Sequence, residues 1–476
     1  MSVQLAILVG YIVLLYAISW YATQLVKRGG GGALNYLLAG RHFPTVVVAT
    51  MITGLAVGGA STVGVAEGAY TQGLSAGWYN AAWGAGGIIV GLLVAEAFRR
   101  MEVRTIPEMM ERMYGSSARL VSIVAQLLIM MVITSLQYVA GGAILAALLP
   151  SIFTFQQGVL LTALVFVGIT LIGGYWAAGL ANVINVILIY IGVVVALFFS
   201  FSNFGGFDAI ASRLPAGGSW FHPISGVGLS VVVAWMVVMI TQTFSVQAIS
   251  QIAFAAKDGR AARRGFIIGG IITLPAGFLC AFFGIIAAAQ FPGLKNAAMA
   301  LPTLVTQITP LVGGLLLAAL WAADISTAVG LLLGCSTLVT EDFLKRLMPG
   351  MISPKREVLI SRLAVLLVSA ATLWLALTSV GILKTVTTAL AMTSSFTLLI
   401  LANIYVPSLC RKVTGFWTIL ASVLVWLAWT WLPAVRIVPH VIYLEWPVCL
   451  VVFALCAVLS REPAEQLIKA TAEAGS

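Results

Sequence analysis

Residues 53–68 read T-G-L-A-V-G-G-A-S-T-V-G-V-A-E-G, an apolar segment unusually dense in glycine. Gly54 and Gly58 have the small-xxx-small spacing that lets membrane helices pack closely, which is one interpretation of the segment. The other is a helix interrupted near Gly58-Gly59, where the interruption frees backbone carbonyl and N–H groups at mid-membrane. The polar run at residues 241–247, inside a later apolar segment, is the candidate for a matching second break.

The composition of the chain is that of a polytopic helical membrane protein. Of its 476 residues, 61% are hydrophobic and 8% are charged, and the mean hydropathy is +1.08. Long apolar runs without alternation exclude a membrane β-barrel. About 13 segments are apolar and long enough to span a bilayer as helices. Numbered as spans 0 to 12, they lie at 3–25, 44–70, 75–98, 118–149, 156–173, 176–202, 224–254, 265–290, 303–340, 358–379, 384–406, 414–432 and 439–460.

The basic residues predict the orientation of these spans. With the N-terminus outside, 21 of the 25 Lys and Arg residues fall in loops on one side of the membrane. The positive-inside rule assigns that side, and with it the C-terminus, to the cytoplasm. We therefore predict a multi-pass protein of the cell membrane, and we interpret the net charge of +10 as a topology signal without nucleic-acid binding. The four basic residues on the other side are Arg213, Lys295, Lys384 and Arg436.

Asp324 lies inside span 8, where a carboxylate costs roughly 2.5–3.5 kcal/mol on insertion scales. Ser326 and Thr327 follow it and supply hydroxyl oxygens, which hard cations prefer as ligands. Three interpretations of Asp324 remain open. It tunes a cation site beside it; it faces a central cavity and pairs with a cationic substrate group or carries a proton; or it is structural, hydrogen-bonded to a neighbour such as Asn182.

Four segments resemble the sodium:solute symporter family, which includes proline, sugar, sialate and pantothenate carriers. The first is Ala39-Gly40-Arg41 before span 1, and the second is the loop 104–115 after span 2. The third is the loop 255–265 after span 6, which is the most specific of the four. The fourth is Ala323-Asp-Ile-Ser-Thr327 together with residues 341–345 at the end of span 8. The four segments occur in the same order as in the family. Each also lies where the family has it, either on the predicted cytoplasmic side or within the corresponding span.

The resemblance implies an all-α fold with two inverted repeats of five helices and a broken span 1. The implied boundaries are an extra N-terminal helix and cytoplasmic link at 1–43, a first repeat at 44–202 (spans 1–5), a second repeat at 203–412 (spans 6–10), and two trailing helices with a short cytoplasmic tail at 413–476.

The resemblance also implies a sodium ion as the coupling ion. In the family, the sodium site takes carbonyl oxygens from the break in span 1 and a carbonyl with two hydroxyls from span 8. The matching residues in this chain are Gly54, Val57, Ala323, Ser326 and Thr327. The three residues of span 8 lie one helical turn apart and share a face.

This chain departs from the family in its span 5, which carries Asn182 where an Asp is common. Some members bind a second sodium with that Asp and with small hydroxyl residues one turn below the conserved pair. The corresponding positions here are Val329 and Gly330, which offer no side-chain oxygen. We therefore predict one sodium per transport cycle.

Candidate substrate contacts are the polar and aromatic residues expected at the inner faces of spans 1, 2, 3, 6 and 8. For each of them, interhelical hydrogen bonding or packing is as good an explanation as substrate binding. No Lys or Arg falls at mid-membrane, which disfavours a strongly anionic substrate such as a phosphate. The candidates are Ser61, Thr62, Tyr79, Asn80, Trp83, Gln137, Gln242, Ser245, Gln247 and Asp324.

The sequence favours a secondary transporter over other classes of protein. No phosphate-binding or nucleophile motif and no metal-ligand spacing appears, so we expect no enzyme. The prediction is a sodium-coupled symporter that imports a small organic solute by alternating access, with no obligate protein partner evident. The alternatives are a proton-coupled carrier that uses Asp324 and a transporter-like membrane sensor.

Overall fold

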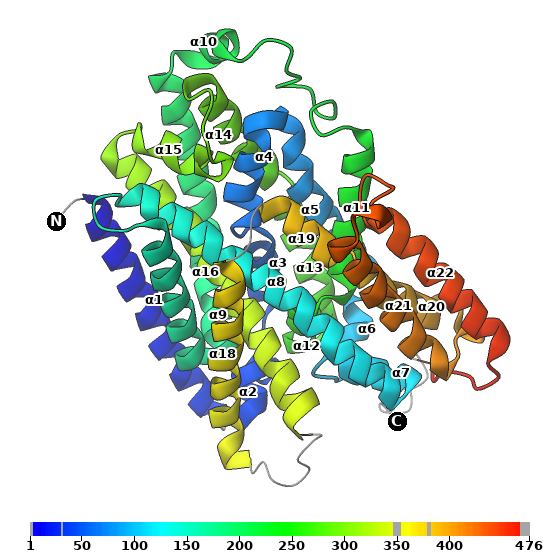
Figure 1. Cartoon of the computed structure of the whole chain (residues 1–476). Helices are drawn as coiled ribbons and strands as arrows, with labels where there is room; N and C mark the ends of the chain where they lie inside the picture. Colours follow the sequence, from blue (N-terminus) through cyan, green and yellow to red (C-terminus); the bar gives the residue numbers. More distant parts are fainter. Residues whose placement is uncertain (1–2, 30–31, 346–353, 378–381, 467–476) are drawn as a thin grey trace.

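A computed structural model describes residues 3–29, 32–345, 354–377 and 382–466, which form a helical bundle (Figure 1). In this part of the chain there is no strand, and β-structure is limited to the isolated bridges Phe43–Ala256 and Arg411–Pro463. The helices of the first half are α1 (Val3–Arg28), α2 (Gly32–Leu38), η1 (Ala39–Arg41), α3 (Thr45–Ala56), η2 (Ala60–Gly64), α4 (Val65–Gln72), η3 (Gly73–Gly77), α5 (Trp78–Leu93), α6 (Ala95–Arg100), α7 (Ile106–Tyr114), α8 (Ser116–Leu148), α9 (Phe155–Asn203) and α10 (Gly206–Arg213).

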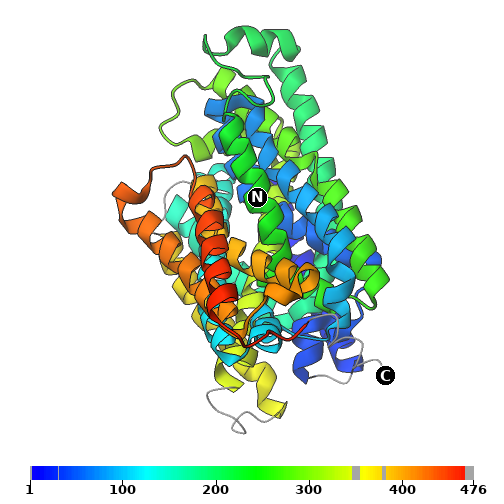
Figure 2. The same ribbon diagram turned by 90° about the vertical axis from the view of Figure 1, so that its right-hand side faces the viewer.

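The second half is helical in the same way, and its last two helices, α21 and α22, pack together at one edge of the bundle (Figure 2). Its helices are α11 (Leu229–Ser245), α12 (Gln247–Ala255), α13 (Gly259–Thr273), α14 (Ala276–Gln290), η4 (Ala297–Met299), α15 (Ala300–Thr306), α16 (Pro310–Thr337), η5 (Leu338–Leu344), α18 (Pro354–Ala376), α19 (Ile382–Leu390), α20 (Thr393–Tyr405), η6 (Pro407–Leu409), α21 (Lys412–Trp431), η7 (Pro433–Val435) and α22 (Ile442–Leu459).

The described residues contain nine helices that are long and apolar enough to cross a membrane, or up to eleven when each bent helix pair counts as one span. Several of these runs exceed one crossing. The 49 residues of α9 would extend about 74 Å at 1.5 Å per residue, against a hydrocarbon core of about 30 Å. Inside α9, Gly174 leaves the helical conformation (φ 56°, ψ −147°), close to the predicted boundary between spans 4 and 5. The predicted total of 13 spans stays a prediction.

Two spans are broken, and both breaks lie in or beside the segments that the sequence indicated. In span 1, α3 ends at Ala56 and the helix restarts at Ala60, with a bend of 54° between the two parts. In span 6, α11 and α12 are bent by 47° around Val246, whose backbone is extended. Small residues and a polar run therefore marked real interruptions of the helices.

Helix α16 is the central element of the bundle. Of the candidate spans it is the most enclosed, with 94% of its apolar window buried. It packs against α8, α9 and α1, and its own residues from Leu316 to Thr337 are all buried. Polar groups on α16 therefore face protein, and each of them needs a partner within the bundle.

One end of the bundle carries a network of ion pairs that joins α7, α8 and η5. The Arg104 guanidinium lies 3.0 Å from the Glu341 carboxylate, which also lies 2.9 Å from the Lys345 ammonium. The Arg119 guanidinium lies 2.7 Å from the buried carboxylate of Asp342. These residues come from two of the segments on which the family resemblance rests, the loop 104–115 and residues 341–345, or lie close to them.

Candidate functional site

The break in span 1 brings a backbone carbonyl of α3 against two hydroxyls of α16. The Thr327 Oγ1 donates to the Gly54 carbonyl at 2.8 Å, and the Ser326 Oγ lies 3.2 Å from the same oxygen. Both hydroxyls also lie close to the Ala323 carbonyl, at 2.7 Å for Ser326 and 3.2 Å for Thr327. In an uninterrupted helix the Gly54 carbonyl would accept from the N–H of Gly58, so this contact depends on the break.

These four oxygens are buried, neutral and close together, which is the donor set that suits a small monovalent cation. The side chains of Ser326 and Thr327 are almost inaccessible to solvent, and Ala323 is fully buried. Val57, the fifth residue of the predicted site, lies at the end of α3 with non-helical backbone angles (φ −99°, ψ 69°). Among the described residues no hydrogen bond links Val57 to α16.

Asn182 of α9 adds an oxygen without a partner beside this cluster. Its amide nitrogen donates to the Ala178 carbonyl at 2.9 Å and lies 3.0 Å from the Met51 sulfur, whereas its Oδ1 is buried and has no hydrogen bond within the described part of the chain. A Cβ built on Gly54 would lie 1.8 Å from that Oδ1 and 3.4 Å from the Ser326 Oγ. An orphaned buried acceptor at this place fits a cation held between α3, α9 and α16.

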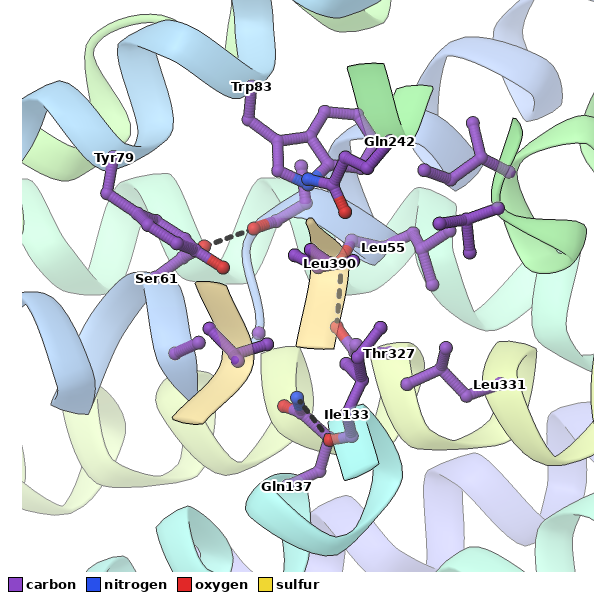
Figure 3. Close-up of a pocket in the computed structure, with 16 residues that line it drawn as sticks. Leu55, Ser61, Tyr79, Trp83, Ile133, Gln137, Gln242, Thr327, Leu331 and Leu390 are labelled. Atoms are coloured by element: carbon purple, nitrogen blue, oxygen red, sulfur yellow. Dashed lines mark hydrogen bonds between the residues drawn. The ribbon is translucent and has the colours of Figure 1, made fainter. Parts of the chain in front are cut away.

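A small cavity adjoins the cluster and shares Thr327 with it. Its volume of about 30 Å³ has room for one or two water molecules, so a solute larger than that requires the surrounding helices to separate. Figure 3 shows the aromatic side chains of Tyr79 and Trp83 on one side of the cavity and Gln137 with Ile133 on the opposite side. Five of the ten predicted substrate residues line it: Ser61, Tyr79, Trp83, Gln137 and Gln242.

The other five predicted substrate residues are buried outside the cavity. Thr62 donates to the Gly58 carbonyl within its own helix, and Ser245 contacts the Thr393 carbonyl of α20. Gln247 hydrogen-bonds the backbone of residues 104 and 106. The amide of Asn80 has no hydrogen-bond partner, and Asp324 is described next.

Asp324 is fully buried, and neither of its carboxylate oxygens has a hydrogen bond of good geometry to any residue that the structure describes. The carboxylate faces the backbone of two glycines. A Cβ on Gly59 would lie 2.6 Å from its Oδ1, and a Cβ on Gly141 would lie 2.7 Å from its Oδ2. Asp324 therefore lies between the break of span 1 and α8, without lining the cavity and without a hydrogen bond to Asn182.

Sequence reasoning overlooked Gln126 of α8 and the apolar wall of the cavity. The wall residues, among them Ile133, Leu331 and Leu390, are ordinary apolar residues in apolar spans, so no sequence signal distinguished them. Gln126 did carry a signal, since it is a polar side chain in the middle of span 3. It is fully buried and bonds backbone groups of span 6.

The comparison with protein families decides the class of this site. A family model described as the sodium:solute symporter family matches residues 36–420. The chain belongs to the sodium:solute symporter family. The family predicted from the four sequence segments is thereby confirmed, and membership supports sodium-coupled transport of a solute across a membrane.

Two relatives of this chain are named as proline carriers. The osmoregulated proline transporter OpuE of Bacillus subtilis (strain 168) is 27% identical over 395 residues, covering 79% of this chain and 78% of that protein. A sodium/proline symporter of Staphylococcus aureus (strain JH9) is 26% identical over 443 residues, covering 88% of this chain and 85% of that protein.

Solved transporter structures share the fold of this symporter family member. A sodium-coupled sialic acid symporter in a substrate-bound outward-open state matches with a TM-score of 0.80 at 19% identity, over 97% of this chain and 99% of that chain. Mhp1, a nucleobase-cation-symport-1 family transporter in a closed conformation, matches with a TM-score of 0.60 at 14% identity, over 92% and 94% of the two chains. These likenesses support the fold.

Proposed function

We propose that this chain couples the inward movement of one sodium ion to the uptake of a small organic solute by alternating access. The observation that carries the proposal is the meeting of the Ser326 and Thr327 hydroxyls with the Gly54 carbonyl, which the break of span 1 has freed. Sodium and solute are both cargo here. Thr327 belongs to the oxygen cluster and also lines the cavity, so binding of sodium at the cluster can directly affect binding of the solute in the cavity.

Sodium would be held by the carbonyls of Gly54, Val57 and Ala323 and by the hydroxyls of Ser326 and Thr327. Such a site joins span 1 to α16, so a bound ion would stabilise the arrangement in which α3 lies against α16. Neutral oxygens hold a monovalent cation weakly enough for release in each cycle. The unpartnered Oδ1 of Asn182 supports a cation at this place.

We infer a stoichiometry of one sodium because Val329 and Gly330, one turn below the hydroxyls of Ser326 and Thr327, offer no side-chain oxygen for a second site. Val329 is buried and apolar, and a Cβ on Gly330 would meet only the Leu55 side chain, at 3.5 Å. Asn182 supplies an amide in place of a carboxylate. The sodium dependence of uptake should accordingly have a Hill coefficient of about 1.

The solute is best described as small and neutral or zwitterionic. The polar groups at the cavity are the amides of Gln137 and Gln242, the hydroxyls of Ser61, Tyr79 and Thr327 and the indole N–H of Trp83, with no Lys, Arg, Asp or Glu among its lining residues. Such donors and acceptors suit a compact solute that is uncharged or zwitterionic, and the proline carriers among the relatives make amino acids the first compounds to test.

The fold boundaries and the orientation belong to the same proposal. Residues 44–202 and 203–412 would form the two inverted repeats, and each repeat begins with one of the broken spans. The ion-pair end of the bundle would lie on the cytoplasmic side of the cell membrane, in agreement with the distribution of basic residues.

The decisive experiment is a sodium titration of hydroxyl-deleted variants. Thermal stabilisation of the purified protein by NaCl, against choline chloride, gives the half-saturating sodium concentration. Ser326→Ala or Thr327→Ala should raise that concentration about tenfold, the equivalent of roughly 1.4 kcal/mol for a lost ligand. Ser336→Ala is the matched control, because it removes a hydroxyl of α16 that bonds the Ser361 carbonyl instead.

An unchanged sodium requirement in both variants would contradict the assigned site. Uptake driven by a pH gradient without sodium, and abolished by Asp324→Asn, would instead support the proton-coupled alternative. The same thermal-shift assay, repeated with amino acids, amines, sugars and carboxylates in the presence and absence of sodium, identifies the solute class.

A further inference from the structure

Gln126 of α8 bridges the break in span 6. Its side-chain amide donates to the Ser245 carbonyl at 2.7 Å, and its Oε1 accepts from the backbone N–H of Gln247 at 3.0 Å. One side chain therefore contacts both sides of Val246, the single residue between the end of α11 at Ser245 and the start of α12 at Gln247.

These two contacts replace hydrogen bonds that the break has removed. In an uninterrupted helix the Ser245 carbonyl would accept from the N–H of Ile249, and the N–H of Gln247 would donate to the Thr243 carbonyl. Here the N–H of Ile249 donates to the Val246 carbonyl at 3.0 Å instead. Ser245 and Gln247 are fully buried, so water does not satisfy their backbone groups, and each group left unpaired costs about 1–3 kcal/mol.

A second glutamine of the same helix bonds the other break. The N–H of Gly59 donates to the Gln137 Oε1 at 2.8 Å, whereas in an uninterrupted span 1 it would donate to the Leu55 carbonyl. Gln126 and Gln137 are 11 residues apart. At about 100° and 1.5 Å per residue, their side chains differ by only about 20° in direction around the axis of α8 and lie about 16 Å apart along it. The two glutamines thus share a face of a helix that is continuous from Ser116 to Leu148.

The inner half of span 6 has further polar contacts in the present conformation. All nine residues of α12 are buried, and the Gln251 amide donates to the Leu37 carbonyl at 2.7 Å and to the Thr337 Oγ1 at 3.2 Å. Movement of α12 away from the bundle must therefore break the amide contacts of both Gln126 and Gln251.

We propose that Gln126 is a positioning residue for transport, and that α8 couples the two breaks through Gln126 and Gln137. Gln137 accepts a hydrogen bond from the break of span 1 beside the oxygen cluster, and Gln126 bonds the break of span 6 that leads into α12. Ordering of span 1 by sodium would pass along α8 and hold α12 closed. This inference rests on the proposed sodium site, because it requires sodium to act at the break of span 1.

Hydrogen–deuterium exchange of the purified full chain, with NaCl or with choline chloride, tests the coupling. Gln126→Met keeps the length of the side chain and removes both contacts, so exchange in a peptide covering residues 245–250 should accelerate by about tenfold or more. Gln137→Met should accelerate exchange at residues 57–62 instead. Ser122→Ala is the control, since Ser122 is buried one turn away on α8 and bonds only the Ala118 carbonyl of its own helix.

The sodium effect separates coupling from simple support of the fold. In the wild-type protein NaCl should slow exchange at both breaks. In Gln126→Met it should still slow exchange at residues 57–62 but no longer at 245–250, whereas a residue that merely supports the fold would leave the sodium effect at 245–250 intact. The latter result, with protection at 57–62 preserved, would overturn the inference alone. Absence of sodium protection at 57–62 in the wild type would instead contradict the proposed sodium site.

Discussion

Gly54 has no room for a side chain, because a Cβ at this position would lie 1.8 Å from the Asn182 Oδ1. Gly54→Ala should therefore push α3 or Asn182 away from the Gly54 carbonyl and raise the half-saturating NaCl concentration about tenfold or more. Thermal stabilisation by NaCl measures this effect. In the double variant Gly54→Ala/Asn182→Ala the smaller side chain restores space, so the half-saturating NaCl concentration should fall below that of Gly54→Ala, while the loss of the Asn182 Oδ1 should keep it above that of the wild type.

Gly10→Ala provides a control for the chemical change itself, because no atom lies within 4 Å of a Cβ at Gly10. Wild-type sodium dependence in Gly54→Ala would remove Gly54 from the sodium site.

For single residues, the sequence predicted which chemical groups a helix face presents better than it predicted which residues of other helices contact them. The grouping of the Ser326 and Thr327 hydroxyls beside the Ala323 carbonyl could be predicted, because residues one turn apart share a helix face whatever packs against it, while the role of this group as a sodium site stays a prediction. The surroundings of Asp324 could not be predicted, because they depend on which glycines of other helices face α16. Gly141 became a neighbour of Asp324 only through the packing of α8 against α16.

Among the helices, the kink within α9 depends on Gly174. Its backbone angles (φ 56°, ψ −147°) lie in a region that residues with a side chain rarely adopt, and a Cβ there would lie 2.6 Å from the Tyr36 carbonyl oxygen. Gly174→Ala should lower the free energy of unfolding by roughly 1–3 kcal/mol. Thermal unfolding in detergent, with Gly10→Ala as the matched control, measures the loss; equal melting temperatures for the two variants would contradict the assigned backbone strain.

The broken helices show which features of an element could be predicted from the sequence and which could not. Glycines at 58 and 59 and the polar run at 241–247 indicated both breaks, since each weakens a continuous helix in a membrane. The residue at the second break is Val246, whose side chain is apolar. The Ser245 carbonyl and the Gln247 N–H on either side of it are bonded by Gln126, which lies 119 residues before Ser245, and no local pattern reveals a contact at that sequence separation.

For the whole molecule, the two ends of the described chain lie toward opposite ends of the helical bundle (Figure 1). Helix α1 has 26 residues and extends about 39 Å, enough to cross the bilayer, and its end at Arg28 leads into α2 at the ion-pair end of the bundle. The backbone N–H of Glu465 donates to the Met113 carbonyl of α7, at that same end (Figure 1). The distribution of basic residues predicts that this end faces the cytoplasm.

Two serine-to-cysteine substitutions test that orientation, because all five native cysteines are buried and give little background labelling. Ser117 at the start of α8 and Ser219 after α10 are both exposed and lie in loops predicted to face opposite sides. In intact cells a membrane-impermeant maleimide should label Ser219→Cys and leave Ser117→Cys unmodified, and both should react after the membrane is permeabilised. The reverse pattern would invert the topology and would place the opening of α12 on the outer side, so that release of Gln126 would admit solute from outside the cell.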